Sequence, residues 1–204
     1  GRLLDFLERE QLSENTLIVL MSDNGASGEG GPAGSVNEYR YFLQQPDSFE
    51  DNLAAIDVIG SPATHNHYPT GWAQAGNTPN KLYKKFTHAG GVRAPMVISW
   101  PSTVKSPGVR DEFRHVTDIV PTLLAAVGVD APTVMKGTGQ LPVHGESFLS
   151  GLRDADRVEE RRSPQYFEMI GNRAIWRDGY KAVTQHEEGA DYEADRWELY
   201  DLRS

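Results

Sequence analysis

The sequence contains no cysteine, no long apolar run and no excess of basic residues. The lack of cysteine excludes disulfide bonds, thiolate metal sites and a cysteine nucleophile within these 204 residues. The longest clean apolar run, Thr16–Met21, is far shorter than the roughly 20 residues of a transmembrane helix, so we expect no membrane span. Acidic residues number 29 against 20 basic ones, and the resulting net charge of -9 argues against nucleic acid as a partner.

The composition that remains is typical of a globular domain. Hydrophobic residues make up 38% of the chain and charged residues 24%, a balance unlike that of disordered or membrane proteins. The length fits one domain, or one domain and part of another. The chain opens with GRLLDFLEREQL, without an initiator methionine or a leader region, which predicts a segment of a longer protein.

The first part of the chain has the pattern of an α/β fold. Leucines at helical spacing predict an amphipathic helix over residues 2–12. Two apolar runs, residues 16–21 and 95–100, predict strands buried on both faces, as in a parallel sheet. Asp23 and Asn24 follow the first of these strands, at the edge where open α/β sheets bind ligands.

The middle of the chain is less regular. Residues 39–81 are polar and interrupted by proline, which predicts loops and one short helix near 51–59. Apolar residues at helical spacing then predict a helix over 119–127, with Thr117 as its N-cap and Gly128 as its end.

The last part of the chain predicts a small antiparallel sheet. A charged stretch, residues 153–162, precedes several short alternating segments. Asp178 and Gly179 lie between two of these segments and are a strong signal for a hairpin.

Two groups of residues could carry chemistry. Asp23 and Asn24 offer adjacent oxygen ligands to a hard cation, although Asp-Asn-Gly is also an ordinary turn sequence. The segment 80–93 places lysines, including Lys84, and the imidazole of His88 before a glycine pair that lets backbone approach a ligand. An anionic group would suit this segment, and a solvated basic loop is the alternative.

Other patterns favour structural interpretations. His65 and His67 have no third ligand at a recognisable spacing, so a metal site there is improbable. Residues 28–34 are rich in glycine but lack the pattern of a phosphate-binding loop, which favours a flexible loop. The sequence contains no G-x-S-x-G nucleophile motif.

Taken together, four segments resemble in order and spacing the carboxyl-terminal part of the sulfatases, in the alkaline phosphatase superfamily: NTLIVLMSDNG, NKLYKKFTHAGGVRAPMVISWP, TDIVPTLLAAVGV and WELYDL. The segment GWAQAGNTPNKLYKKFTHAGGVRAP resembles bacterial arylsulfatases in particular. The resemblance implies part of a mixed, mostly parallel sheet flanked by helices, with a small carboxyl-terminal antiparallel subdomain. Residues 1–160 would then be an incomplete α/β domain, and residues 161–204 the truncated small subdomain.

The resemblance also implies roles for individual residues. Asp23 and Asn24 match the family's pair of calcium ligands, and Lys84 matches the K-x-x-T lysine that contacts the sulfate group. Thr87 and His88 are candidates for contact with the substrate. An asparagine oxygen suits calcium, whereas superfamily phosphodiesterases typically carry a zinc-binding histidine at the position of Asn24, so this residue favours sulfate esters over phosphate esters.

The sequence also departs from the family. Ala89 stands where relatives commonly have Glu or Gln. The family's nucleophile is a formylglycine made in a C/S-x-P-x-R motif of the amino-terminal half, and Ser99–Thr103 imitates only the start of that motif. The expected partners are therefore a sulfate ester substrate and the missing amino-terminal half, with calcium shared between the two halves. The isolated chain is expected to bind calcium weakly and to be inactive.

Two alternatives remain open. A phosphodiesterase or phosphonate hydrolase of the same superfamily would share the fold. A non-catalytic sulfatase-like protein could use the same residues to bind a sulfated ligand.

Overall fold

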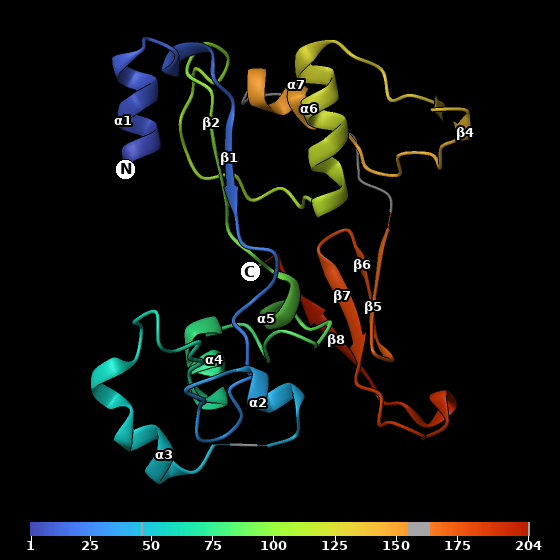
Figure 1. Ribbon diagram of the computed structural model, residues 1–204. Helices are drawn as coiled ribbons and strands as arrows, with labels where there is room; N and C mark the ends of the chain where they lie inside the picture. Colours follow the sequence, from blue (N-terminus) through green and yellow to red (C-terminus); the bar gives the residue numbers. More distant parts are fainter. Residues whose placement is uncertain (46, 155–163, 204) are drawn as a thin grey trace. The chain divides into compact units, whose positions relative to one another are not determined.

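The computed structural model describes residues 1–45, 47–154 and 164–203, and the chain divides into two compact units (Figure 1). Unit 1 contains Gly1–Leu20 and Val97–Arg162, and unit 2 contains Met21–Met96 and Ser163–Ser204. Each unit is therefore assembled from two separate stretches of sequence. The domain boundary proposed between residues 160 and 161 lies outside the described residues. Over the described ranges, no helix has the length and apolar character needed to cross a bilayer.

Unit 1 begins with a helix that is shorter than its pattern predicts. The pattern extends over residues 2–12, whereas α1 spans Arg2–Arg9. Gln11 has a φ of 58°, a left-handed conformation that cannot continue a right-handed helix. Leu3, on the apolar side of α1, is 69% exposed, so the predicted amphipathic face lies open in this chain. A 3-10 turn, Ser13–Asn15, follows the helix.

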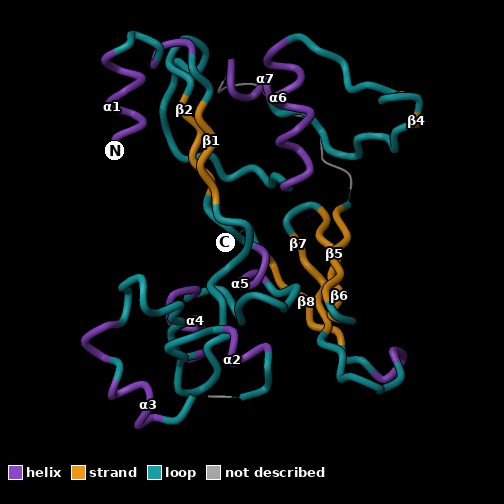
Figure 2. The backbone as a smooth tube through the Cα atoms, viewed as in Figure 1, coloured by secondary structure: helices purple, strands orange, loops and turns teal. Residues whose placement is uncertain are grey.

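Two short strands lead out of unit 1 and back into it. β1 (Ile18–Met21) and β2 (Met96–Ser99) form a two-stranded sheet and lie side by side in Figure 2. Both strands are confirmed, but burial on both faces is not, because Leu20 is 68% exposed and Val97 is 61% exposed. The described residues contain no parallel sheet. Within the described residues each strand has one hydrogen-bonded neighbour, so its other edge is unpaired there.

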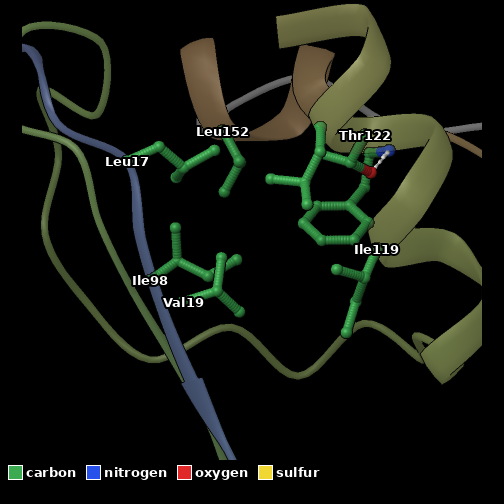
Figure 3. Close-up of a pocket in the computed structure, with 8 residues that line it drawn as sticks. Leu17, Val19, Ile98, Ile119, Thr122 and Leu152 are labelled. Atoms are coloured by element: carbon green, nitrogen blue, oxygen red, sulfur yellow. Dashed lines mark hydrogen bonds between the residues drawn. The ribbon is translucent and has the colours of Figure 1, made fainter.

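Two helices pack against these strands to form the core of unit 1. Helices α6 (Ile119–Val127) and α7 (Leu149–Arg153) supply apolar side chains that face those of the strands across a small apolar space (Figure 3). The residues that line it are Leu17, Val19, Ile98, Ile119, Thr122, Leu123, Phe148 and Leu152. Phe148 is only 5% exposed, and burying such a side chain stabilises the fold by about 1.5–3 kcal/mol. A short antiparallel hairpin, β3 (Val134–Met135) with β4 (Thr138–Gly139), also belongs to this unit.

A buried carboxylate holds the start of α6. The predicted cap, Thr117, is wrong: a 3-10 turn, Val116–Asp118, precedes the helix, so Thr117 lies inside the turn and Asp118 occupies the N-cap position. The Asp118 carboxylate accepts hydrogen bonds from the backbone N–H of His115 at 2.8 Å and of Glu146 at 2.9 Å. The predicted end of the helix at Gly128 is confirmed, with a φ of 69°.

Unit 2 contains more helix than the sequence predicts. The single short helix expected near 51–59 corresponds to α3 (Phe49–Ala54) and a following 3-10 turn (Ile56–Val58). The sequence did not predict α2 (Tyr39–Phe42), α4 (Thr70–Asn77) or α5 (Ala89–Val92). Gly71 and Gly76 lower the helix propensity of α4, and tertiary burial of Ala73, which is fully inaccessible, compensates.

The predicted carboxyl-terminal antiparallel sheet is confirmed as four strands in sequential order. These are β5 (Gln165–Met169), β6 (Asn172–Arg177), β7 (Tyr180–Thr184) and β8 (Trp197–Asp201). Asp178 and Gly179 form the turn between β6 and β7 with φ values of 52° and 83°, as their sequence predicts. A further 3-10 turn, Tyr192–Ala194, precedes β8. Ala174 and Val183 are buried within this sheet.

We predict that Asp118→Ala lowers the free energy of unfolding by about 1–3 kcal/mol, because it removes a buried carboxylate and leaves two part-buried backbone N–H groups without their acceptor. Urea denaturation of the protein and the variant measures the loss. Asp130→Ala is the matched control, since Asp130 is exposed, and its effect should stay within about 0.5 kcal/mol. Equal losses in the two variants would contradict this account of Asp118.

Candidate active site

Asp23 and Asn24 lie directly after β1, where the sequence predicts them. The Asn24 side-chain nitrogen donates to the Gly25 carbonyl at 2.8 Å, and the Ser22 hydroxyl donates to the Asn24 carbonyl at 2.9 Å. Asp23 is exposed, and its carboxylate has no hydrogen bond or ion pair with any described residue. The turn therefore presents two oxygen donors of the kind that a hard cation prefers.

Close backbone packing places this turn beside the segment 80–93. The Gly25 N–H donates to the Gly91 carbonyl at 2.9 Å. A Cβ atom on Gly25 would lie 1.7 Å from the Gly90 carbonyl oxygen, so no other residue fits there. The glycine pair also fits tightly, because a Cβ on Gly90 would lie 1.9 Å from the Leu82 carbonyl oxygen. The sequence predicts that the glycine pair lets backbone approach a ligand. In the structure, the groups that pack closely against the pair include backbone atoms of Gly25, Lys81 and Leu82.

Asn77, the last residue of α4, connects three segments of this region. Its side-chain oxygen accepts from the Ala26 N–H at 3.2 Å. Its side-chain nitrogen donates to the carbonyls of Leu82 at 2.9 Å and Gly90 at 2.8 Å. The sequence gives no signal for a role of Asn77, because no clear helical pattern marks α4.

Lys84 pairs with a residue that no sequence pattern singles out. Its backbone N–H donates to the Ala26 carbonyl at 2.9 Å, and its ammonium group lies 2.6 Å from Glu29 Oε2. The Glu29 side chain is 9% exposed and that of Lys84 is 37% exposed. Glu29 belongs to the glycine-rich segment that predicted only a flexible loop, and a single acidic residue among glycines was the available signal.

The charges around Glu29 compensate for its burial. Burial by itself raises the pKa of Glu29, but hydrogen bonds from Lys84 and Ser27 and the charges of Lys84 and Lys85 outweigh it, so the pKa is lowered. The Lys85 ammonium lies 3.6 Å from Glu29 Oε1. Glu29 is therefore an anion that holds two lysines, and a bound anionic substrate would compete with it for Lys84.

His88 is buried rather than open to a ligand. It is 1% exposed, and its Nε2 lies 3.3 Å from Glu198 Oε2 on β8. Both carboxylate oxygens of Glu198 accept hydrogen bonds from the Lys81 ammonium at 2.8 Å, and the Tyr200 hydroxyl also bonds to this carboxylate. We call Lys81, His88, Glu198 and Tyr200 the Glu198 cluster. Substrate contact by His88 stays a prediction, and its observed partner is Glu198.

The Glu198 cluster shifts the titration of its members. Hydrogen bonding from Lys81, followed by that from Tyr200, lowers the pKa of Glu198 to about 2. Burial lowers the pKa of His88, and the hydrogen bond to Glu198 opposes this only in part. Glu198 is therefore ionised at neutral pH, where the lowered pKa of His88 favours its neutral imidazole.

The structure brings Asp23, Asn24 and Lys84 into one region, through the contacts of Gly25 with Gly91 and of Lys84 with Ala26. The described residues hold no cluster of three or more histidine, aspartate or glutamate side chains suited to a metal, and calcium binding by Asp23 and Asn24 stays a prediction. His65 and His67 have separate partners, Glu38 at 3.3 Å and the Tyr68 carbonyl at 3.2 Å.

Family models match the chain over most of its length. A model described as "Sulfatase" matches residues 1–129, and one described as "N-sulphoglucosamine sulphohydrolase, C-terminal" matches residues 80–204. An uncharacterized sulfatase of Schizosaccharomyces pombe is 33% identical over 99% of this chain and 35% of its own length. The arylsulfatase of Klebsiella aerogenes is 28% identical over 80% of this chain and 33% of its own. The chain thus spans about a third of these relatives.

Solved structures share the fold at lower identity. The PsFucS1 sulfatase from Pseudoalteromonas sp. aligns with a TM-score of 0.53 and 21% identity, over 99% of this chain and 34% of that one. Ps i-CgsB, solved in complex with k-i-k-neocarrahexaose, aligns with a TM-score of 0.55 and 21% identity, over 99% of this chain and 33% of that one.

We predict that Gly90→Ala destabilises the protein by about 1–3 kcal/mol, because its Cβ would collide with the carbonyl oxygens of Leu82 and Lys81. Gly76→Ala in α4 is the matched control: a Cβ there meets nothing within 4 Å, so this variant should be neutral or slightly stabilising. Thermal unfolding compares the two variants. A Gly90→Ala protein as stable as Gly76→Ala would show that the backbone approach is not as tight as described.

We predict that the stabilisation from Glu198 disappears in acid. The folded pKa of about 2 lies below the ordinary value of 4.5, so the contribution is present above about 4.5 and is lost as the pH falls toward 2. Urea midpoints of the protein and of Glu198→Gln, measured at several pH values, should differ by a constant amount near neutrality. The difference should shrink below about pH 4.5. A difference that does not change with pH would exclude the carboxylate as its source.

Proposed function

The chain belongs to the sulfatase family, and from this premise we propose that it is the carboxyl-terminal part of an arylsulfatase that hydrolyses sulfate esters to an alcohol or phenol and sulfate. The observation that carries this proposal is the adjacency of the Asp23–Asn24 turn and residues 81–88, the Lys84 loop, made by backbone contacts at Gly25 and Ala26. Residues 1–160 would belong to the catalytic α/β domain, with its mostly parallel sheet completed by the rest of the protein. Residues 161–204 would form the small subdomain.

Asp23 and Asn24 are proposed to hold calcium. Their oxygen donors suit this ion, and the Asp23 carboxylate is exposed and unpaired among the described residues. Calcium takes six to eight oxygen ligands, so most of the site would come from the missing amino-terminal half and the substrate. When bound, the cation would supply positive charge beside the sulfate oxygens, where negative charge develops during ester cleavage.

Lys84 is proposed to bind the sulfate group and to stabilise it as the ester bond breaks. Its ammonium group pairs with Glu29 at 2.6 Å, which restrains the position of the side chain. The sulfate oxygens would share or replace this pairing, which favours an anion over a neutral ligand. His88 is proposed as a further substrate-binding residue. The nucleophile would be a formylglycine in the amino-terminal half.

We predict that Lys84→Ala lowers kcat/KM of the full-length protein toward 4-nitrophenyl sulfate by about 10²–10³-fold, as expected when one electrostatic stabiliser is lost. Lys105→Ala is the control, because Lys105 is an exposed lysine whose ammonium group donates to the Pro101 carbonyl at 2.9 Å.

Chelation of calcium should abolish activity of the full-length protein, and residues 1–204 alone should show none. Faster hydrolysis of bis(4-nitrophenyl) phosphate than of the sulfate ester would favour a phosphodiesterase, and binding of sulfate without turnover would favour a non-catalytic protein.

A further inference from the structure

One carboxylate on β8 contacts the Lys84 loop on both sides of Lys84. Glu198 accepts two hydrogen bonds at 2.8 Å from Lys81, which lies before Lys84 in the sequence. It also lies 3.3 Å from Nε2 of His88, which follows Lys84. The sheet makes a third contact with the loop, because the Asn172 side chain on β6 donates to the Lys85 carbonyl at 3.2 Å.

The loop needs such support because its backbone is strained. Leu82 has a φ of 65° and Lys85 a φ of 81°, so Lys84 lies between two non-glycine residues in the left-handed region. Residues in this region persist only where surrounding contacts impose the conformation, and they cluster at functional sites. Leu82 is held by Asn77 and Gln74 of α4, whereas Lys85 and both ends of the loop are held by the carboxyl-terminal sheet.

We propose that Glu198 is a positioning residue for Lys84: by holding Lys81 and His88, it fixes the strained loop so that the Lys84 ammonium points at the sulfate site. Glu198 itself does not touch the substrate. The inference rests on the proposed function, because it assigns Glu198 a purpose only if Lys84 binds sulfate. It gives the small antiparallel sheet a part in catalysis without a reacting group of its own.

The burial of His88 supports a positioning role for Glu198. His88 is almost fully buried, and its Nδ1 is buried with no hydrogen-bond partner in the described chain. The ring is therefore fixed through Nε2 and Glu198. A side chain of the same shape without charge, as in Glu198→Gln, keeps the packing but replaces one accepting oxygen by a donor that faces the Lys81 ammonium. This substitution therefore alters the contacts of the cluster without opening a cavity.

The experiment measures steady-state hydrolysis of 4-nitrophenyl sulfate by the full-length protein and four variants: Glu198→Gln, Lys84→Ala, the double variant, and Glu188→Gln as a control. Glu188 is an exposed glutamate in the same sheet region. We expect Glu198→Gln to lower kcat by about tenfold, since small displacements of a catalytic group are costly. We expect Glu188→Gln to match the parent, and thermal unfolding should show that every variant remains folded at the assay temperature.

The double variant distinguishes positioning from general structural support. If Glu198 acts through Lys84, Glu198→Gln should lower kcat by less than about twofold when Lys84 is already alanine. The effects of the two substitutions on kcat are then not additive. Additive losses, or a kcat of Glu198→Gln equal to that of the parent, would overturn the inference while leaving the role of Lys84 intact. Full activity in Lys84→Ala would instead overturn the proposed function and this inference with it.

Binding of inorganic sulfate provides a second readout that needs no turnover. Calorimetry should show weaker sulfate binding in Glu198→Gln than in the parent, and equal binding in Lys84→Ala and the double variant. If Glu198→Gln fails to fold, Lys81→Met removes the same contact from the loop side and is measured in the same way. Unchanged kcat and sulfate affinity in Lys81→Met would overturn the inference.

Discussion

The site depends on the backbone contact between Gly25 and the pair Gly90 and Gly91. Any side chain on Gly25 would place its Cβ 1.7 Å from the Gly90 carbonyl oxygen, so the two loops meet main chain to main chain. This contact places an acidic turn, which offers oxygen donors, next to a basic loop, which offers an ammonium group. Opposite charges are thereby available on two sides of one small region, an arrangement suited to an anion held together with a cation.

Electrostatic compensation is the second constraint. The chain carries a net charge of -9, yet the loop 81–88 contains three lysines. Glu29 pairs with Lys84 and Lys85, and Glu198 pairs with Lys81. These two carboxylates come from segments distant in sequence, and the pKa of each is lowered by its lysines together with a hydroxyl group, Ser27 for Glu29 and Tyr200 for Glu198. The lysines can therefore lie close together without strong mutual repulsion.

Sequence patterns anticipated the parts that local chemistry determines. Asp178 and Gly179 specify a hairpin by their tolerance of positive φ, Gly128 ends α6, and the position of Asp23 and Asn24 follows from the apolar run before them. Patterns could not reveal Glu29, Asn77 or Glu198, because each has a partner far away in the sequence: Lys84, Ala26 and Lys81, respectively. The exposed faces of β1 and β2 mark another limit: an apolar run does not show which elements will pack on its two faces.

The separation between Lys81 and Glu198 has a consequence for how the molecule is made. These partners are 117 positions apart, and unit 2 is built from two stretches with part of unit 1 between them. During synthesis, the Lys84 loop leaves the ribosome long before β8 does. Its strained backbone therefore lacks the contacts with Glu198 until the end of the chain has been made. Contacts between residues so far apart in the sequence slow folding. A premature stop codon between the codons of His88 and Glu198 would keep every residue of the Lys84 loop but would remove the carboxylate that contacts Lys81 and His88.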